Sequence, residues 1–188
     1  KEVVEMTSQF GQRGEVRRLI LGGTEANVAQ FAAMLPKSVQ QVVVGAINAD
    51  VTASPTEVGE KSLALIQQVA AEYKIDLVDQ LITTAAKGGP AALGLANTLV
   101  AVDARRARHL VLDDGFAAPA YRCDNCGYVG AEVMEEDACP LCSARLRLLP
   151  DAADSLVRWA VEQDIDVTFV AGNPALQQAG SIGALLRY

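Results

Sequence analysis

The sequence of 188 residues is poor in several residue types that catalytic and nucleic-acid-binding sites commonly use. It has one histidine, His109, and nine aromatic residues. It has no run of about 18 apolar residues, so no membrane-spanning helix is expected. No basic and then apolar leader follows Lys1, so no signal peptide is expected, and the absence of an initiator methionine indicates that upstream sequence has been lost. The hydrophobic content of 51% predicts one large or two small packed domains.

Positive charge is scarce as well, and it is unevenly distributed. The formal net charge is −7, and residues 88–188 contain no lysine. Residues 1–87 hold 8 basic and 10 acidic residues, whereas residues 88–188 hold 8 and 13. A field of this sign repels phosphate groups, so a broad basic face that binds nucleic acid is not expected. Because aromatic platforms are few, any contact with RNA is expected to be local.

Helix and strand patterns alternate along the chain, which predicts a parallel or mixed α/β architecture. Helices are predicted up to Gly11, over Val28–Leu35, from Pro55 to Lys87, over Leu95–Val102, from about Asp151 and over Pro174–Ala179. Strands are predicted over Val16–Leu21, Gln41–Ile47, His109–Leu112, Ile165–Val170 and Ile182–Tyr188. The helix at Pro55 has the strongest start, because Ser54 can cap it and Glu57 can complete a capping box.

All four cysteines lie in one segment, as two Cys-x-x-Cys pairs separated by twelve residues: Cys123, Cys126, Cys139 and Cys142. This spacing lets four thiolates meet at one tetrahedral point, as Zn²⁺ requires. The segments Tyr128–Met134 and Ala144–Leu149 suit the strands of a zinc ribbon. Two disulfides or a redox dithiol are the alternatives, but nothing indicates an oxidising compartment, and a redox pair needs one Cys-x-x-Cys at a helix start. Four cysteines leave no position for water, so the Zn²⁺ is expected to be structural.

No arrangement of side chains in the sequence indicates catalysis. His109 lies in an apolar run and is interpreted as a structural histidine at a strand start rather than as a general base. Asp113 and Asp114 are adjacent, so their side chains would point to opposite sides of a strand, and they are interpreted as turn residues. Asp50 follows a strand and could be an acid or a ligand, although the loop before a helix explains it equally well. We therefore assign no catalytic residue, and whether the protein is an enzyme stays open.

Two further features have both a functional and a structural interpretation. Gly22-Gly23-Thr24 lies between a strand and a helix, where backbone amides can hold an anion. The segment lacks the Lys-Ser/Thr pair of a phosphate-binding loop, which favours a packing or turn role. Arg105, Arg106 and Arg108 form the densest basic cluster. They suit a solvated helix end, and a contact with RNA or a protein partner is the less favoured interpretation.

Three segments resemble the archaeal and eukaryotic class 1 peptide-chain release factors and their Pelota-like relatives. The closing run 180–188, Gly-Ser-Ile-Gly-Ala-Leu-Leu-Arg-Tyr, is similar to the end of their third domain, with Ser181 in place of a glycine. The cysteine-rich insert within 121–149 resembles the one that archaeal release factors carry in that domain. Leu19–Glu25 and Asp50–Ser54 resemble the later part of the middle domain in bacterial members of the superfamily.

The resemblance implies an α/β fold in two parts. Residues 1–75 would be the later part of an RNase H-like middle domain. Residues 76–188 would be an α-β-α sandwich similar to kink-turn-binding ribosomal proteins, with the zinc ribbon inserted at about 119–149. Removal of the Zn²⁺ is expected to unfold the ribbon and to leave most of the sandwich folded.

The resemblance also implies a cytoplasmic role in translation termination or ribosome rescue, in a bacterium or an archaeon. The ribosome or tRNA would be the partner, and a translational GTPase or another protein would dock on the second domain. Release by this superfamily needs a Gly-Gly-Gln loop, which the sequence lacks and which would precede Lys1. The residues present are therefore expected to supply docking and scaffold. The alternatives are a non-enzymatic zinc-ribbon interaction protein without the translation role and, less favoured, an independent hydrolase that uses the middle domain.

Overall fold

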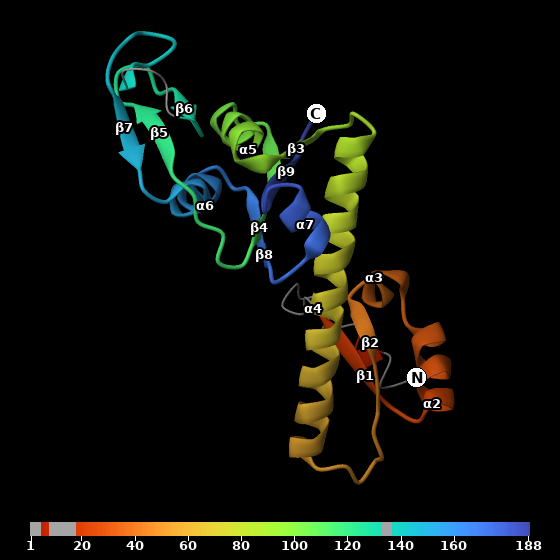
Figure 1. Ribbon diagram of the computed structural model, residues 1–188. Coiled ribbons are helices and arrows are strands. Elements are labelled where there is room, and N and C mark those ends of the chain that lie inside the picture. The colour runs from red at the N-terminus through yellow and green to blue at the C-terminus, as the bar shows by residue number, and fades with distance from the viewer. Residues whose placement is uncertain (1–4, 8–17, 133–136) are drawn as a thin grey trace. The chain divides into compact units, whose positions relative to one another are not determined.

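The computed structural model describes residues 5–7, 18–132 and 137–188, whose helices and strands are labelled in Figure 1. The helix predicted to end at Gly11 lies mostly outside these residues, although residues 5–7 are helical. The chain divides into two compact units, Lys1–Tyr73 and Lys74–Tyr188. The boundary falls within one long helix, α4 (Pro55–Ala86), whose residues contribute to both units.

The first unit is built around two parallel strands joined by two helices. In chain order its elements are β1 (Leu19–Gly23), α2 (Glu25–Met34), α3 (Lys37–Gln40) and β2 (Val43–Asn48). Leu21, Leu35 and Val39 are buried together in its core. A helix and two strands are thus found where the apolar patterns predict them, although the first two residues of the predicted strand Val16–Leu21 lie outside the described part of the chain. The short α3 was not predicted, because four residues are too few to show a helical period.

The α4 helix begins as the sequence predicts. The Ser54 Oγ accepts a hydrogen bond from the main-chain N–H of Glu57 at 3.2 Å, and Pro55 is the first helical residue. The Glu57 carboxylate accepts from Lys61 Nζ at 2.8 Å. The serine half of the predicted capping box therefore forms, whereas the Glu57 side chain makes an ion pair with Lys61, one turn further along the helix. Within the first unit, glycine at position 45 allows α4 to pack on β2, because a Cβ atom there would lie 3.0 Å from Leu65 Cδ2.

The second unit contains a four-stranded mixed sheet in the order β3-β9-β4-β8. Its strands are β3 (Ala91–Leu93), β4 (Ala107–Asp113), β8 (Asp166–Val170) and β9 (Ile182–Leu186). β4 and β8 are parallel, whereas β9 is antiparallel to both of its neighbours. The prediction of a mixed α/β architecture is confirmed. The three-residue β3 was not predicted.

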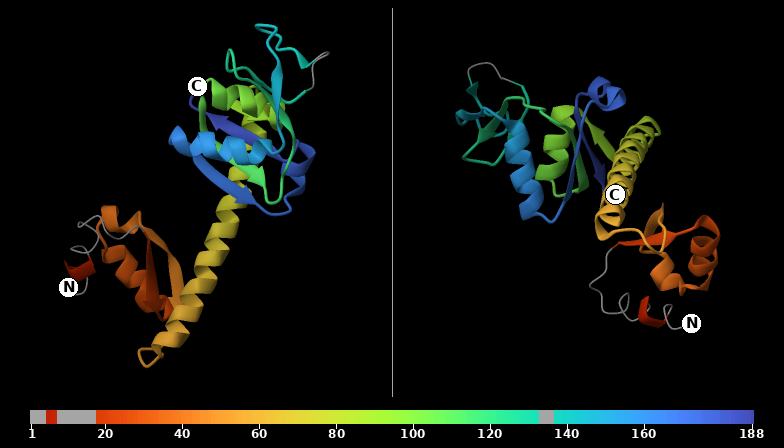
Figure 2. Two further views of the ribbon diagram at one scale, coloured as in Figure 1. Left: turned by 90° about the vertical axis from the view of Figure 1, so that its left-hand side faces the viewer. Right: turned by 90° about the horizontal axis from the view of Figure 1, so that it is seen from below.

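Helices cover both faces of this sheet, which gives three layers (Figure 2). On one face, α5 (Gly94–Asp103) and α6 (Ala152–Glu162) pack on the residues of β4 that include Leu110. On the other face, the last part of α4 and α7 (Pro174–Gln178) pack on Val111. Because neighbouring residues of a strand point to opposite faces, Leu110 and Val111 belong to different cores. The second unit is therefore an α-β-α sandwich.

Candidate metal centre

The four cysteines belong to the segment between β4 and α6 in the sequence, which forms a small three-stranded antiparallel sheet. Its strands, in the order β6-β5-β7, are β5 (Ala120–Cys123), β6 (Val129–Gly130) and β7 (Leu146–Leu149). The predicted strand Tyr128–Met134 is represented by the two residues of β6, and its last two residues lie outside the described part of the chain. The predicted strand Ala144–Leu149 begins two residues later than expected. β5 was not predicted, although its last residue is the first cysteine.

Each Cys-x-x-Cys pair forms a turn with the same main-chain hydrogen bonds. In the first turn, the N–H of Gly127 donates to the carbonyl of Cys123 at 2.9 Å, and the N–H of Cys123 donates to the carbonyl of Tyr128 at 2.8 Å. In the second turn, the N–H of Ser143 donates to the carbonyl of Cys139, and the N–H of Cys139 donates to that of Ala144, both at 2.8 Å. The two turns are therefore two copies of one local structure.

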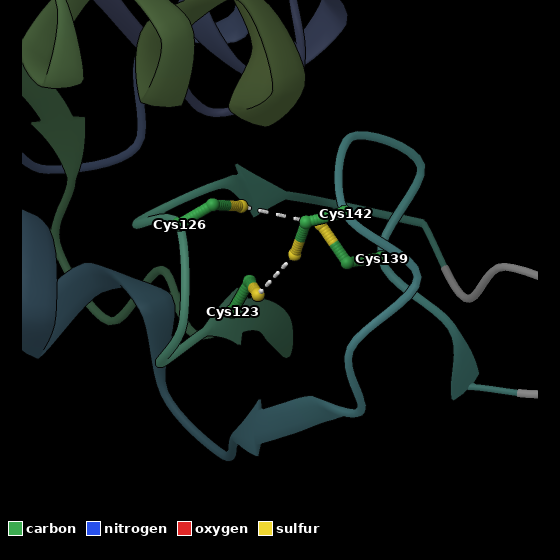
Figure 3. Close-up of side chains that lie close together, drawn as sticks. All are labelled: Cys123, Cys126, Cys139 and Cys142. Atoms are coloured by element: carbon green, nitrogen blue, oxygen red, sulfur yellow. Dashed lines mark hydrogen bonds between the residues drawn. The ribbon is translucent and has the colours of Figure 1, made fainter.

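These two turns bring the four sulfur atoms to one point (Figure 3). All four Sγ atoms lie within 4.8 Å of one another. The Sγ atoms of Cys123 and Cys142 are 3.4 Å apart, and those of Cys126 and Cys139 are 3.5 Å apart, so both short contacts join the first turn to the second. Sulfurs at 2.3 Å from a tetrahedral Zn²⁺ stand about 3.8 Å apart. The four thiols can therefore hold one tetrahedral metal ion, and thiolate ligands favour a soft or borderline metal such as zinc.

The surroundings of the thiols favour ionisation of some of them over others. The Asn125 side chain and the Ala144 main chain lower the pKa of Cys142 to about 6. The Tyr128 amide lowers the pKa of Cys126, but burial and the neighbouring thiols outweigh it and raise that pKa to about 12. Four thiolates this close together repel one another, so full ionisation needs a bound cation.

One end of the cysteine-bearing sheet, where β5 starts and β7 ends, is part of the main core of the second unit. Ala120, Val129 and Leu149 are buried in the same cluster as the side chains of α5 and α6. The guanidinium of Arg122, on β5, lies over the ring of Trp159, on α6, with its Cζ 5.4 Å from the ring centroid. The sequence did not indicate this shared core, because its partners are far apart along the chain.

The residues considered for catalysis do not converge on one site. His109 Nε2 lies 2.8 Å from Thr168 Oγ1, and burial lowers the pKa of its imidazole. The Asp113 carboxylate accepts from the N–H of Gly172 at 3.1 Å and from Gln177 Nε2 at 2.8 Å, which ties β4 to α7 and to the loop before it. Both contacts join neighbouring elements of the sandwich, as a structural role requires.

Asp50 is likewise part of a local turn. Its Oδ1 accepts from the N–H of Thr52 at 2.9 Å and from Thr52 Oγ1 at 2.6 Å. The side-chain and main-chain hydrogen bonds from Thr52 lower the pKa of Asp50. An exposed carboxylate held in this way is a poor general acid at neutral pH. The geometry favours the interpretation of Asp50 as a loop residue before α4.

The three arginines singled out from the sequence lie in and after the turn between α5 and β4. Arg105 has a left-handed backbone, with φ +55°, and Arg105, Arg106 and Arg108 are all exposed. The structure adds a fourth arginine beside them, because the main-chain N–H of Arg187 donates to the carbonyl of Arg106 at 2.8 Å. The run of arginines is visible in the sequence, but Arg187 lies about 80 residues further along the chain and only the sheet brings it there.

Comparison with known proteins points to one superfamily. Residues 1–67 match the model of the family described as bacterial archaeo-eukaryotic release factor family 10. The predicted resemblance to the release-factor superfamily is confirmed. A search of curated protein sequences found no significant match.

Solved structures of release-factor relatives have the same fold. The whole chain aligns with 48% of archaeal Pelota in a model of ribosome-bound Pelota and ABCE1, at 16% identity and a TM-score of 0.57. It aligns with 53% of Dom34 from S. cerevisiae, at 10% identity and a TM-score of 0.55. It also aligns with 54% of Archaeoglobus fulgidus Pelota, at 18% identity and a TM-score of 0.50. The chain thus spans about half the length of these proteins.

Among the described residues, no helix is both long and apolar enough to cross a membrane.

Proposed function

We propose that this chain acts on or beside ribosomes, as a release-factor-like protein in translation termination or ribosome rescue. One observation carries the proposal: the chain aligns over its length with the fold of archaeal Pelota, which the matching structure describes as ribosome-bound. The family match over residues 1–67 supports it independently, because it rests on sequence. Since the 188 residues contain no Gly-Gly-Gln tripeptide, their role is docking and scaffold rather than hydrolysis.

The domain assignment is part of the same proposal. Residues 1–75 are the later part of an RNase H-like middle domain, and residues 76–188 are a third domain of the release-factor type. The sandwich of the second unit offers the surface for a protein partner, such as a translational GTPase. The solved structure of Dom34 describes that protein as interacting with Hbs1, which supports a partner of this kind. A protein that acts on or beside ribosomes in this way works in the cytoplasm.

Zn²⁺ is the metal proposed for the cysteine site, with Cys123, Cys126, Cys139 and Cys142 as its ligands. The bound ion would supply cross-linking and charge neutralisation, and it would leave no open position for a substrate. The protein's own contribution is the pair of matching turns, which hold two thiols each at the right separation. Elemental analysis of the purified chain should find one zinc per chain, and a variant with Cys126→Ser and Cys142→Ser should contain none.

Co-sedimentation with ribosomes across a salt series tests the proposed role. The chain is expected to pellet with ribosomes and to stay bound at moderate salt. The variant with Cys126→Ser and Cys142→Ser separates binding through the cysteine-bearing sheet from binding through the rest of the sandwich. Absence of binding even at low salt would contradict the ribosomal role. The alternative would then be favoured: a zinc-ribbon interaction module that keeps the fold but has no role in translation. The absence of a Gly-Gly-Gln tripeptide from the sequence is compatible with that alternative.

A further inference from the structure

We propose that one end of the sheet in the second unit binds single-stranded RNA. The surface, called here the arginine–tyrosine surface, consists of Arg105, Arg106, Arg108, Arg187 and Tyr188. The proposal deepens the proposed function, on which it rests for the choice of RNA over DNA. The guanidinium groups of this surface would bind the phosphates of the RNA, and the exposed tyrosine ring would stack on a base.

Main-chain and side-chain hydrogen bonds gather these residues from two distant segments. The turn after α5 carries Arg105 and Arg106, and the end of β9 returns beside it. Arg187 Nε donates to the carbonyl of Ala107 at 3.2 Å, and Arg106 Nη2 donates to the main-chain oxygen of Tyr188 at 2.9 Å. The arginine–tyrosine surface is therefore held by the sheet itself.

The charge of the arginine–tyrosine surface is not neutralised by ion pairs. Among the described residues, salt bridges involve Lys61, Arg147 and Arg158, and none involves an arginine of this surface. Four of the eight arginines in residues 88–188 are concentrated here, in the more acidic part of the chain. Acidic neighbours exist, since Asp103 ends α5 and Asp166 lies near His109. They weaken the attraction for phosphate, so binding is expected to depend steeply on salt.

An exposed ring and a hollow beside it favour a nucleic acid over an acidic peptide. The Tyr188 side chain is 76% exposed, and Arg106 Cζ lies 5.9 Å from the centroid of its ring. Arg106 also lines a hollow of about 370 Å³ with Asn97, Val100 and the apolar side chains of β3 and Leu186. A base can stack on the ring or enter this hollow while its phosphate meets an arginine. An acidic peptide would use the arginines but would have no need for the ring or the hollow.

Binding of a fluorescent 12-nucleotide single-stranded RNA of mixed sequence, followed by anisotropy, tests the proposal. Contacts between four arginines and phosphates predict a slope of about −3 in log K against log [salt]. The double variant Arg105→Gln with Arg108→Gln should bind about tenfold more weakly and have a slope shallower by about 1.4. Within the described residues, neither side chain makes a hydrogen bond or ion pair that the fold would lose. Tyr188→Ala should weaken binding about tenfold, and Tyr188→Phe should restore it.

Arg158→Gln is the matched control, because it removes the same charge from an exposed arginine on α6. Equal losses for Arg158→Gln and for the single variant Arg108→Gln would show a general charge effect and would overturn the proposal. So would the absence of RNA binding at 50 mM salt, or an arginine-dependent interaction with polyglutamate alone. Ribosome co-sedimentation is measured separately: RNA binding with these variant effects supports the surface whether or not ribosomes are bound, and RNA binding that the variants leave unchanged overturns it.

Discussion

Gly127 and Ser143 occupy the same position in the two cysteine turns, and both have a left-handed backbone. Their φ angles are +81° and +59°, and each follows the second cysteine of its pair. Glycine adopts this conformation at no steric cost, whereas serine has a Cβ atom that disfavours it. The two turns therefore have the same backbone, but the second one is the more strained.

This difference predicts opposite effects for two substitutions. Ser143→Gly should stabilise the metal-loaded chain by up to about 1 kcal/mol, because it removes the strain of a left-handed serine. Gly127→Ala should destabilise it by about 1 kcal/mol, although no other atom lies within 4 Å of the added Cβ. The measurement is the midpoint of denaturant unfolding, together with zinc affinity by chelator competition. Two shifts of the same sign would contradict the equivalence of the turns.

Ser181 has a left-handed backbone as well, with φ +62°, at the position where the resembling family has glycine. Its N–H donates to the carbonyl of Leu176 at 2.8 Å, and its carbonyl accepts from the N–H of Asp113 at 2.8 Å, so the conformation is fixed by the sandwich. Ser181→Gly should therefore raise the stability of the second unit by up to about 1 kcal/mol. Ser155→Gly, the same substitution inside α6, should lower it by about 0.5 kcal/mol. If both variants unfolded at a lower temperature than the parent chain, backbone strain at Ser181 would not explain why the resembling family has glycine at this position.

Trp159 is the only tryptophan, and it reports on the contact between the cysteine-bearing sheet and α6. Removal of the metal with a chelator should disorder the two turns and lift Arg122 from the indole ring, so the emission of Trp159 should shift to longer wavelength. The sandwich should remain folded but melt several degrees lower, because Ala120, Val129 and Leu149 belong to its core. Far-UV circular dichroism recorded on the same sample distinguishes local from global unfolding. Complete loss of helical signal on chelation, or in Cys139→Ser, would mean that the sheet is integral to the sandwich.

His109 predicts a pH dependence of stability. Burial lowers its pKa below the ordinary value of 6.5, and the nearby Arg108 lowers it further against the opposing effect of Asp166. The unfolded chain then binds the proton more readily than the folded chain does. The contribution of His109 is therefore complete above pH 6.5 and is lost as the pH falls toward the folded-state pKa. An NMR titration of this single histidine measures the pKa directly, and a value above 6.5 would contradict the prediction. In His109→Gln, the fall in melting temperature between pH 7.5 and 5.5 should be smaller.

Local patterns in the sequence were sufficient for much of the fold and for the metal site. The serine cap of α4 and the two Cys-x-x-Cys turns involve residues within about five positions of one another, so spacing and residue type alone specify them. The alternation of apolar segments likewise predicted most helices and strands. The closing run of residues carried the resemblance to release factors, and its left-handed Ser181 shows the physical reason for glycine at that position.

Contacts between distant segments were decided by the tertiary structure. The strand β3 has three residues and no visible period, and it exists because β9 pairs with it. Arg187 joins the turn of Arg106 because the same sheet returns the end of the chain to that point. Leu149 enters the sandwich core only when β7 packs near α6. These contacts are stabilised by surfaces that come together only when the chain folds, so no local sequence pattern predicts them. The cysteine turns, in contrast, are specified by a spacing that the sequence itself contains.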